Sequence, residues 1–190
     1  MTAEELKDDQ FRLVYEEEDS DLRIYENKGA FPRAFVVRDW KVVQNERALL
    51  RELVSDQFQP KRLALLEEPA SFSRRLRSSI QEEDKIEIMR YEASLVEISA
   101  WLKKPGLLVF TDSYFPGWRV YVDEKEKRIY QVDYILRGVF LSSGKHQVRF
   151  VYKPRSFIIG AIFSATSLLV MGVIWLGCLK KVKALSLFGR

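Results

Sequence analysis

The feature that most limits the fold of this 190-residue chain is a run of 24 uncharged residues, Ser156–Leu179, near its C-terminal end. As an α-helix this run is ~36 Å long, enough to cross a hydrocarbon layer of about 30 Å with some tilt. Tyr152 and Trp175 fall near the two expected membrane interfaces, where amphipathic aromatic side chains are enriched, and Lys180 and Lys181 follow the run. The sequence therefore predicts one transmembrane helix over residues 156–179, with the lipid bilayer as a partner.

The excess of basic residues belongs to this C-terminal part of the chain. The formal net charge is +4, but six cations and no acids follow residue 152, which leaves 25 cations against 27 acids in residues 1–152. A protein that binds nucleic acid needs its basic residues clustered on the folded body. Since the body carries a net charge of −2, we expect no nucleic-acid partner.

The charges that flank the predicted helix do not give its orientation, because four cations lie within about 15 residues on each side. They are Lys145, Arg149, Lys153 and Arg155 before it, and Lys180, Lys181, Lys183 and Arg190 after it. The N-terminal sequence MTAEELKDDQ is acidic and lacks the apolar core of a signal peptide. Two interpretations remain: a tail-anchored protein with a cytosolic body, or a chain whose Met1 lies inside a longer protein with earlier spans that export the body.

Residues 1–83 show weaker patterns than the rest of the body. Residues 1–20 are acidic and are expected to be flexible. A smaller α/β part is predicted over residues 21–83 from spacing, capping and turn signals. Its expected elements are strands at 22–25 and 34–37 around a turn at 27–29, a helix from an Asn45 N-cap to about residue 56, a strand at 62–66, and then a loop or an exposed helix with Arg74, Arg75 and Arg77.

Residues 84–152 alternate between short apolar runs and turn signals. The seven runs that resemble strands are 86–91, 95–101, 107–110, 118–122, 128–132, 138–141 and 146–152. Runs at this spacing indicate an antiparallel sandwich or barrel. The predicted fold class is thus α+β and mainly antiparallel β: a sandwich-like part at 84–152, the smaller part at 21–83, one transmembrane helix, and a basic tail at 180–190.

The densest group of residues with ligand-binding chemistry lies at the turn around Pro116-Gly117, between two predicted strands. Aromatic faces cover the C–H surface of a sugar ring, and polar groups fix its hydroxyls. The candidate glycan-binding residues are Asp112, Tyr114, Trp118 and Arg119. The structural alternative is that Pro-Gly makes the turn, the aromatic side chains fill the core, and Asp112 caps the loop.

No catalytic or metal-binding pattern stands out elsewhere. One cysteine and one histidine exclude cysteine-based zinc sites and multi-histidine sites, so we expect no metal and no cofactor. His146 is expected to be a strand residue at a hairpin, because no Ser or Cys plus Asp arrangement marks it as a catalytic base. In the predicted membrane helix, Gly160 and Ser164 form a small-xxx-small face that would let another helix approach, although membrane helices also tolerate small residues without such a role.

Several segments resemble the C-terminal region of the bacterial YfhO-like membrane proteins. In order along the chain they are Arg23–Asn27, Phe31–Phe35, Leu107–Asp123, Arg137–Val139, Gly144–His146 and Tyr152–Phe157. The chain departs from the family at Glu124, where a Gly commonly follows the Asp. This departure weakens the expectation of a tight turn at that hairpin.

The resemblance implies a relation to C-type glycosyltransferases, which use a polyprenyl-phosphate sugar to modify envelope polymers such as teichoic acids on the outer face of the membrane. Their catalytic carboxylate lies in an early extracytoplasmic loop that has no counterpart here, so we assign no catalytic residue. The implied role is that of an extracytoplasmic accessory domain, residues 21–152, with the last span and a cytoplasmic tail. Its implied partners are other helices of a polytopic transferase and an envelope glycan. The alternative is a stand-alone single-span interaction protein without a glycan ligand.

Overall fold

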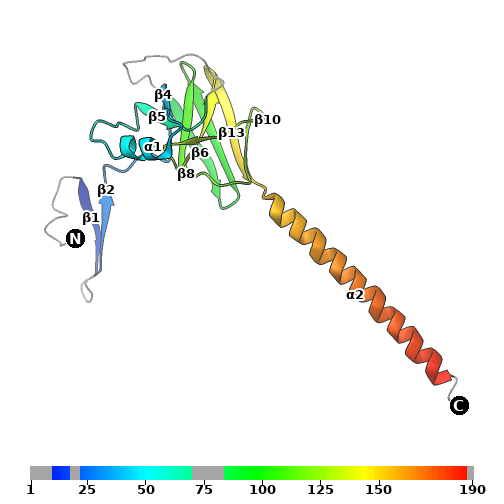
Figure 1. The fold of residues 1–190 in the computed structure, drawn as a ribbon. Helices are drawn as coiled ribbons and strands as arrows, with labels where there is room; N and C mark the ends of the chain where they lie inside the picture. The colour runs from blue at the N-terminus through cyan, green and yellow to red at the C-terminus, as the bar shows by residue number, and fades with distance from the viewer. Residues whose placement is uncertain (1–9, 18–21, 70–83, 188–190) are drawn as a thin grey trace.

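The computed structural model describes residues 10–17, 22–69 and 84–187, with side chains through residue 175. In this part of the chain two β-sheets pack face to face as a sandwich, and a long helix leaves one end of it (Figure 1). The predicted fold class is confirmed: the described chain is mostly antiparallel β-sheet, with two helices, of which the C-terminal one is long and apolar enough to span a membrane.

The first sheet of the sandwich has five strands. In spatial order they are β10 (Lys125–Lys127), β9 (Trp118–Val122), β13 (Gly144–Tyr152), β7 (Leu95–Leu102) and β6 (Lys85–Glu92), with every neighbouring pair antiparallel. Successive side chains of a strand point to opposite faces. In β7 the buried residues are accordingly Val96, Ile98, Ala100 and Leu102, and the residues between them are only partly buried.

The second sheet has six strands. In spatial order they are β3 (Ala34–Val37), β8 (Gly106–Ser113), β12 (Leu136–Leu141), β11 (Tyr130–Val132), β5 (Leu63–Leu66) and β4 (Asp39–Val42). Only β4 and β5 pair in parallel among the described strands. They are joined through helix α1 (Glu46–Leu53), the crossover connection that a parallel pair requires.

Two apolar clusters stabilise the six-stranded sheet, one on each face. The inter-sheet cluster draws on β7, β8, β9, β12 and β13 and has Phe110 stacked on Phe150, with ring centroids 5.7 Å apart. The second cluster lies on the other face and contains Trp40, which meets Phe140 edge-on at 4.9 Å. Because β8 is buried on both faces, residues 106–110 form one continuous buried run.

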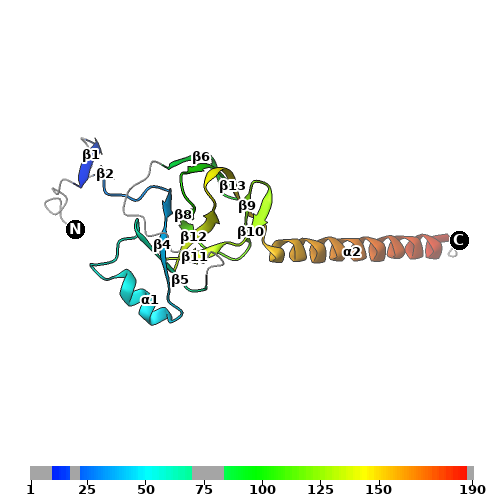
Figure 2. The same cartoon turned by 90° about the horizontal axis from the view of Figure 1, so that it is seen from above.

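The N-terminal strands pair differently from the sequence-based prediction. Strand β2 (Arg23–Asn27) pairs with β1 (Phe11–Glu16), where no element was predicted, and the hairpin they form stands apart from the sandwich (Figures 1 and 2). The strands predicted at 22–25 and 34–37 both form, but they do not pair with each other across the turn at 27–29. The buried strand β3 instead pairs with β8 and adds an edge to the core sheet. Residues 1–9, 18–21 and the predicted arginine-containing loop lie outside the described residues.

The predicted α/β part at 21–83 contributes directly to the sandwich, because β3, β4 and β5 belong to the same sheet as β8 and β12. The predicted N-cap is confirmed: Asn45 Oδ1 accepts a hydrogen bond from the Ala48 amide at 3.0 Å. The helix ends at Leu53, short of the predicted residue 56, and anchors itself through the fully buried Leu49.

The predicted strand at 128–132 forms only over β11, Tyr130–Val132, in the six-stranded sheet, and it is preceded by β10, Lys125–Lys127, which belongs to the five-stranded sheet. Before β10, the chain reverses in a tight turn with Asp123 at φ 50° and Glu124 at φ 63°. Two central residues at positive φ define the type I′ hairpin turn. The tight turn therefore forms despite the glutamate, which corrects the weaker expectation drawn from the missing glycine.

Replacing Glu124 by glycine is expected to stabilise the protein by about 0.5–1 kcal/mol. The substitution removes a cost of roughly 1–2 kcal/mol that a non-glycine residue has in the left-handed conformation. Part of this gain is lost, because glycine makes the unfolded chain more flexible and so raises its entropy. The exposed ion pair with Arg149 that would be lost contributes little. Urea denaturation in detergent measures the change. The control is Glu126→Gly in β10, where glycine should destabilise; a loss of stability in Glu124→Gly would contradict the strain argument.

Helix α2 (Arg155–Leu187) extends away from the sandwich as a single rod of 33 residues (Figure 2). Its segment Arg155–Trp175 has a mean hydropathy of 2.3 and is long enough to cross a membrane. The helical backbone continues past the predicted end at residue 179 into the basic segment. Only Lys153 and Pro154 separate β13 from α2, so the connection is as short as the sequence suggested.

Candidate functional site

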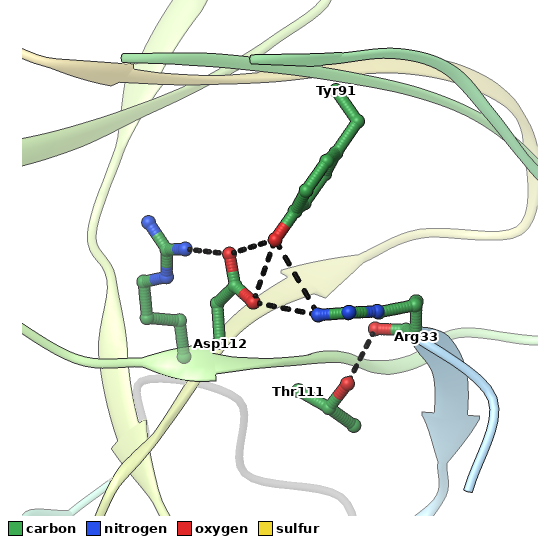
Figure 3. A network of polar contacts seen from close by, with 5 residues as sticks. Arg33, Tyr91, Thr111 and Asp112 are labelled. Carbon is green, nitrogen blue, oxygen red and sulfur yellow. Dashed lines mark hydrogen bonds and ion pairs between the residues drawn. The ribbon is translucent and has the colours of Figure 1, made fainter. Parts of the chain in front are cut away.

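Asp112 lies at the centre of a polar network at the end of the sandwich from which α2 leaves. Its carboxylate accepts a hydrogen bond from Arg137 Nη2 at 2.9 Å and from Arg33 Nη1 at 3.3 Å. The Tyr91 hydroxyl donates to the same carboxylate at 3.1 Å and accepts from Arg33 at 3.4 Å. Figure 3 shows Arg33 and Tyr91 pointing at Asp112, with Thr111 donating to the Arg33 carbonyl. Two arginines and a phenol thus satisfy one carboxylate.

Arg137 is the buried member of this network, with 1% of its surface exposed. Its guanidinium carbon lies 3.9 Å from the centre of the Trp118 ring, and the rings of Phe110 and Phe150 lie within 5.5 Å. Burial lowers the pKa of Arg137 below its usual value, and the charge of Asp112 opposes that shift. Nε and Nη1 of Arg137 are buried without a hydrogen-bond partner among the described residues, so its aromatic neighbours supply much of its stabilisation.

The four predicted glycan-binding residues occupy three separate places. Asp112 and Trp118 are brought together, but both contact the Arg137 guanidinium within the protein, Asp112 through a hydrogen bond and Trp118 through its ring. Arg119 follows Trp118 on β9 and lies 3.7 Å from Glu126. Tyr114 is in the turn after β8, where its amide donates to the Ile135 carbonyl.

Tyr114 lines a cavity of about 270 Å³. The other lining residues are Glu67, Glu68, Arg128, Ile129, Tyr130 and Gln131. Arg128 pairs with Glu68 and lies over the Tyr130 ring at 5.3 Å, and the Gln131 amide donates to the Tyr134 carbonyl. Glu67 Oε1 is buried and has no hydrogen-bond partner among the described residues. Carboxylates, phenols and an amide around a small cavity can bind a ligand rich in hydroxyl groups.

Sequence reasoning missed Arg137 in the network around Asp112 and the two glutamates that line the cavity. Arg137 was noted only as part of the segment that resembles the family. It alternates with Val139 and Leu141 along β12, so its side chain lies on the same, core-facing side of the strand. A cation at a core-facing position of a predicted strand indicates a buried cation. For Glu67 and Gln131 the sequence holds no comparable signal, because they meet Tyr114 only through the pairing of β5 with β11 and β11 with β12.

His146 makes contacts that its sequence context did not reveal. Its Nδ1 lies 2.7 Å from Asp123 Oδ2, and its Nε2 lies 3.1 Å from both the hydroxyl and the carbonyl oxygen of Ser142. The pKa of Asp123 is lowered, chiefly by a hydrogen bond from the Gln147 amide and then by His146. The histidine thus ties the β9–β10 turn to the β12–β13 turn. The expectation that no serine and aspartate accompany His146 was wrong, because the fold brings Asp123 and Ser142 to its two ring nitrogens from other turns.

Gly160 and Ser164 lie on the exposed surface of α2. A Cβ atom placed on Gly160 would have no described heavy atom within 4 Å, so a neighbouring helix would meet no obstruction there from this chain.

The fold and the polar site together define a class of protein: a β-sandwich that continues, without a flexible linker, into a helix of membrane length. A family model described as "Bacterial membrane protein YfhO" matches residues 53–164, more than half of the chain and across the junction of β13 with α2. The chain therefore belongs to the YfhO family of bacterial membrane proteins, which confirms the resemblance seen in the sequence. Searches of curated proteins and of solved structures gave no match.

Proposed function

We propose that residues 21–152 form an extracytoplasmic accessory domain that holds an acceptor glycan close to the bilayer during envelope glycosylation. In this proposal α2 spans the membrane as the last helix of the assembly, and the basic segment 180–190 is cytoplasmic. The chain supplies binding and position, while a polytopic transferase supplies the chemistry of sugar transfer.

The cavity at Tyr114 is the observation that carries this proposal. Its volume of about 270 Å³ is near the lower limit of typical ligand sites, roughly 300–1,000 Å³, and suits a single sugar unit of a polymer. A buried Glu67 oxygen without a partner offers a hydrogen-bond acceptor to a hydroxyl group. The turn that carries Tyr114 ends at Gly117, whose carbonyl accepts a hydrogen bond from Lys153 just before α2. A glycan bound there would lie near the membrane surface.

The predicted contact residues take different roles in this proposal. Tyr114 contacts the glycan directly, and Arg119 is an outer contact because its pairing with Glu126 is long and exposed. Asp112 and Trp118 act through Arg137 by fixing the strand ends on either side of the turn. Gly160 and Ser164 form the face on which other helices of the transferase pack.

Replacing Tyr114 by alanine is expected to weaken glycan binding about tenfold, the loss typical of one aromatic contact of ~1.4 kcal/mol. The test is a calorimetric titration of the full chain in nanodiscs with a soluble teichoic-acid fragment. The control is Tyr15→Ala on the separate β1–β2 hairpin, which should leave the affinity unchanged. Equal affinity of Tyr114→Ala and the unchanged protein would remove the cavity as the glycan site.

The side of the membrane on which the body lies is tested separately. A membrane-impermeant protease added to intact cells should digest the body if it is extracytoplasmic. A protected body would instead support the alternative of a single-span interaction protein whose body faces the cytosol.

A further inference from the structure

The turn between β8 and β9 is fastened to the first residues of the membrane-length helix. The Lys153 amide donates to the Gly117 carbonyl at 2.7 Å. A Cβ atom on Gly117 would lie 3.1 Å from Pro154 Cα and 3.0 Å from the Tyr152 ring, and Gly117 has a φ of 108° that favours glycine. The turn therefore approaches the start of α2 as closely as a backbone can.

Aromatic side chains gather at this junction. Phe115 is 59% exposed, and its ring centre lies 6.4 Å from that of Tyr152. Tyr152 also contacts Trp118, with ring centres 5.3 Å apart. Tyr and Trp are the residues enriched at membrane interfaces. An exposed phenylalanine beside them is costly in water and suited to the boundary between headgroups and acyl chains.

The two chain segments that meet at the junction together carry cations and no acids. Lys153 and Arg155 flank Pro154, and the segments 114–118 and 152–160 contain no acid. Neither cation has an ion pair with a described residue. Long cationic side chains next to an apolar helix extend toward the lipid phosphates.

We infer that Phe115 and its turn insert into the headgroup layer, with Lys153 and Arg155 on lipid phosphates, so that the sandwich stands directly on the membrane surface. This inference rests on the proposal that α2 spans the bilayer. The uncharged part of α2 begins at Ser156, so the edge of the hydrocarbon layer lies there and Pro154 lies among the headgroups. Whatever packs on Pro154 lies at the same depth.

The experiment measures the depth of a fluorophore at three positions of the full chain in nanodiscs. On a Cys178→Ser background, Phe115→Cys, Lys104→Cys and Leu169→Cys each carry an NBD label. Lys104 lies beyond the far end of β13, about eight strand residues or roughly 26 Å from Tyr152. Lipids that carry a nitroxide on the headgroup or deep in the acyl chain serve as quenchers.

We expect headgroup nitroxide to quench label 115 at least threefold more than label 104, and acyl-chain nitroxide to quench label 169. If label 115 behaves like label 104 while label 169 is quenched, the inserted turn is refuted and the spanning helix stands. If label 169 is also unquenched, the membrane anchor itself fails.

A second comparison tests the two cations. Adding phosphatidylglycerol to phosphatidylcholine nanodiscs should increase the quenching of label 115, and Lys153→Gln with Arg155→Gln should abolish that increase. An increase that survives both substitutions would overturn the assignment of phosphate contacts to these side chains.

Discussion

Replacing Arg137 by alanine is expected to lower the free energy of unfolding by about 3 kcal/mol, at the lower end of the cost of breaking a buried ion pair. The substitution removes the cation from Asp112 and leaves a cavity beside Trp118 and Phe110. The cost stays at the lower end because Asp112 is 24% exposed and keeps Arg33 and Tyr91 as partners. Chemical denaturation of the full chain in detergent measures the loss.

Two further variants separate charge from packing at this position. Arg137→Met fills most of the space without a charge and should cost clearly less than alanine. Combining it with Asp112→Asn should recover part of the remaining loss, because position 112 then no longer holds a partly buried carboxylate that has lost its closest cation. A cost below about 1 kcal/mol for Arg137→Ala would contradict the view that this ion pair closes the end of the sandwich.

Replacing Asp133 by asparagine is expected to raise stability at pH 8 by up to about 3 kcal/mol and to leave it nearly unchanged at pH 4. Burial raises the pKa of Asp133 to about 6, although a hydrogen bond from the Leu65 amide at 2.7 Å acts in the opposite direction. Asparagine keeps the acceptor for that amide and tolerates the positive φ of 48° at this turn. It removes only the charge.

The sign of the pH dependence follows from the raised pKa. Between about pH 4 and pH 6 the native carboxyl group keeps its proton while the unfolded one loses it, so the native state binds more protons. The free energy of unfolding therefore falls through this window as pH rises, and the charge remains a cost above it. Denaturation curves from pH 4 to 8 should show this fall in the unchanged protein and in the exposed control Asp56→Asn. A curve for Asp133→Asn that falls equally would refute the argument.

The strands could be predicted from the sequence wherever one face is buried, because alternation then leaves a visible pattern. Strand β7 shows it residue by residue, and the prediction of 95–101 agrees with Leu95–Leu102. Pairing between distant segments leaves no such local trace. The partner of β3 is β8, more than 70 residues later along the chain, and the pairing is favourable because it buries residues such as Val37 against the apolar clusters of the core sheet.

The candidate site was foreseeable only in part for the same reason. Asp112 lies on the same side of β8 as the core residues Leu108 and Phe110, and Arg137 lies on the same side of β12 as Val139. The alternation along the two strands therefore indicated a carboxylate and a cation that both face the core, where they pair. Arg33, by contrast, reaches Asp112 from 79 residues away. The prediction that Asp112 and Trp118 bind glycan remains a prediction, and in the structure both are engaged with Arg137.

The short junction between β13 and α2 has a mechanical consequence. Two residues join them, and the hydrogen bond from Lys153 to Gly117 removes most of the remaining freedom. A rotation of α2 about its long axis must then be transmitted as torque to the entire sandwich, because no swivel lies between them. A protein that binds α2 within the bilayer would thereby also set the orientation of the sandwich relative to the membrane.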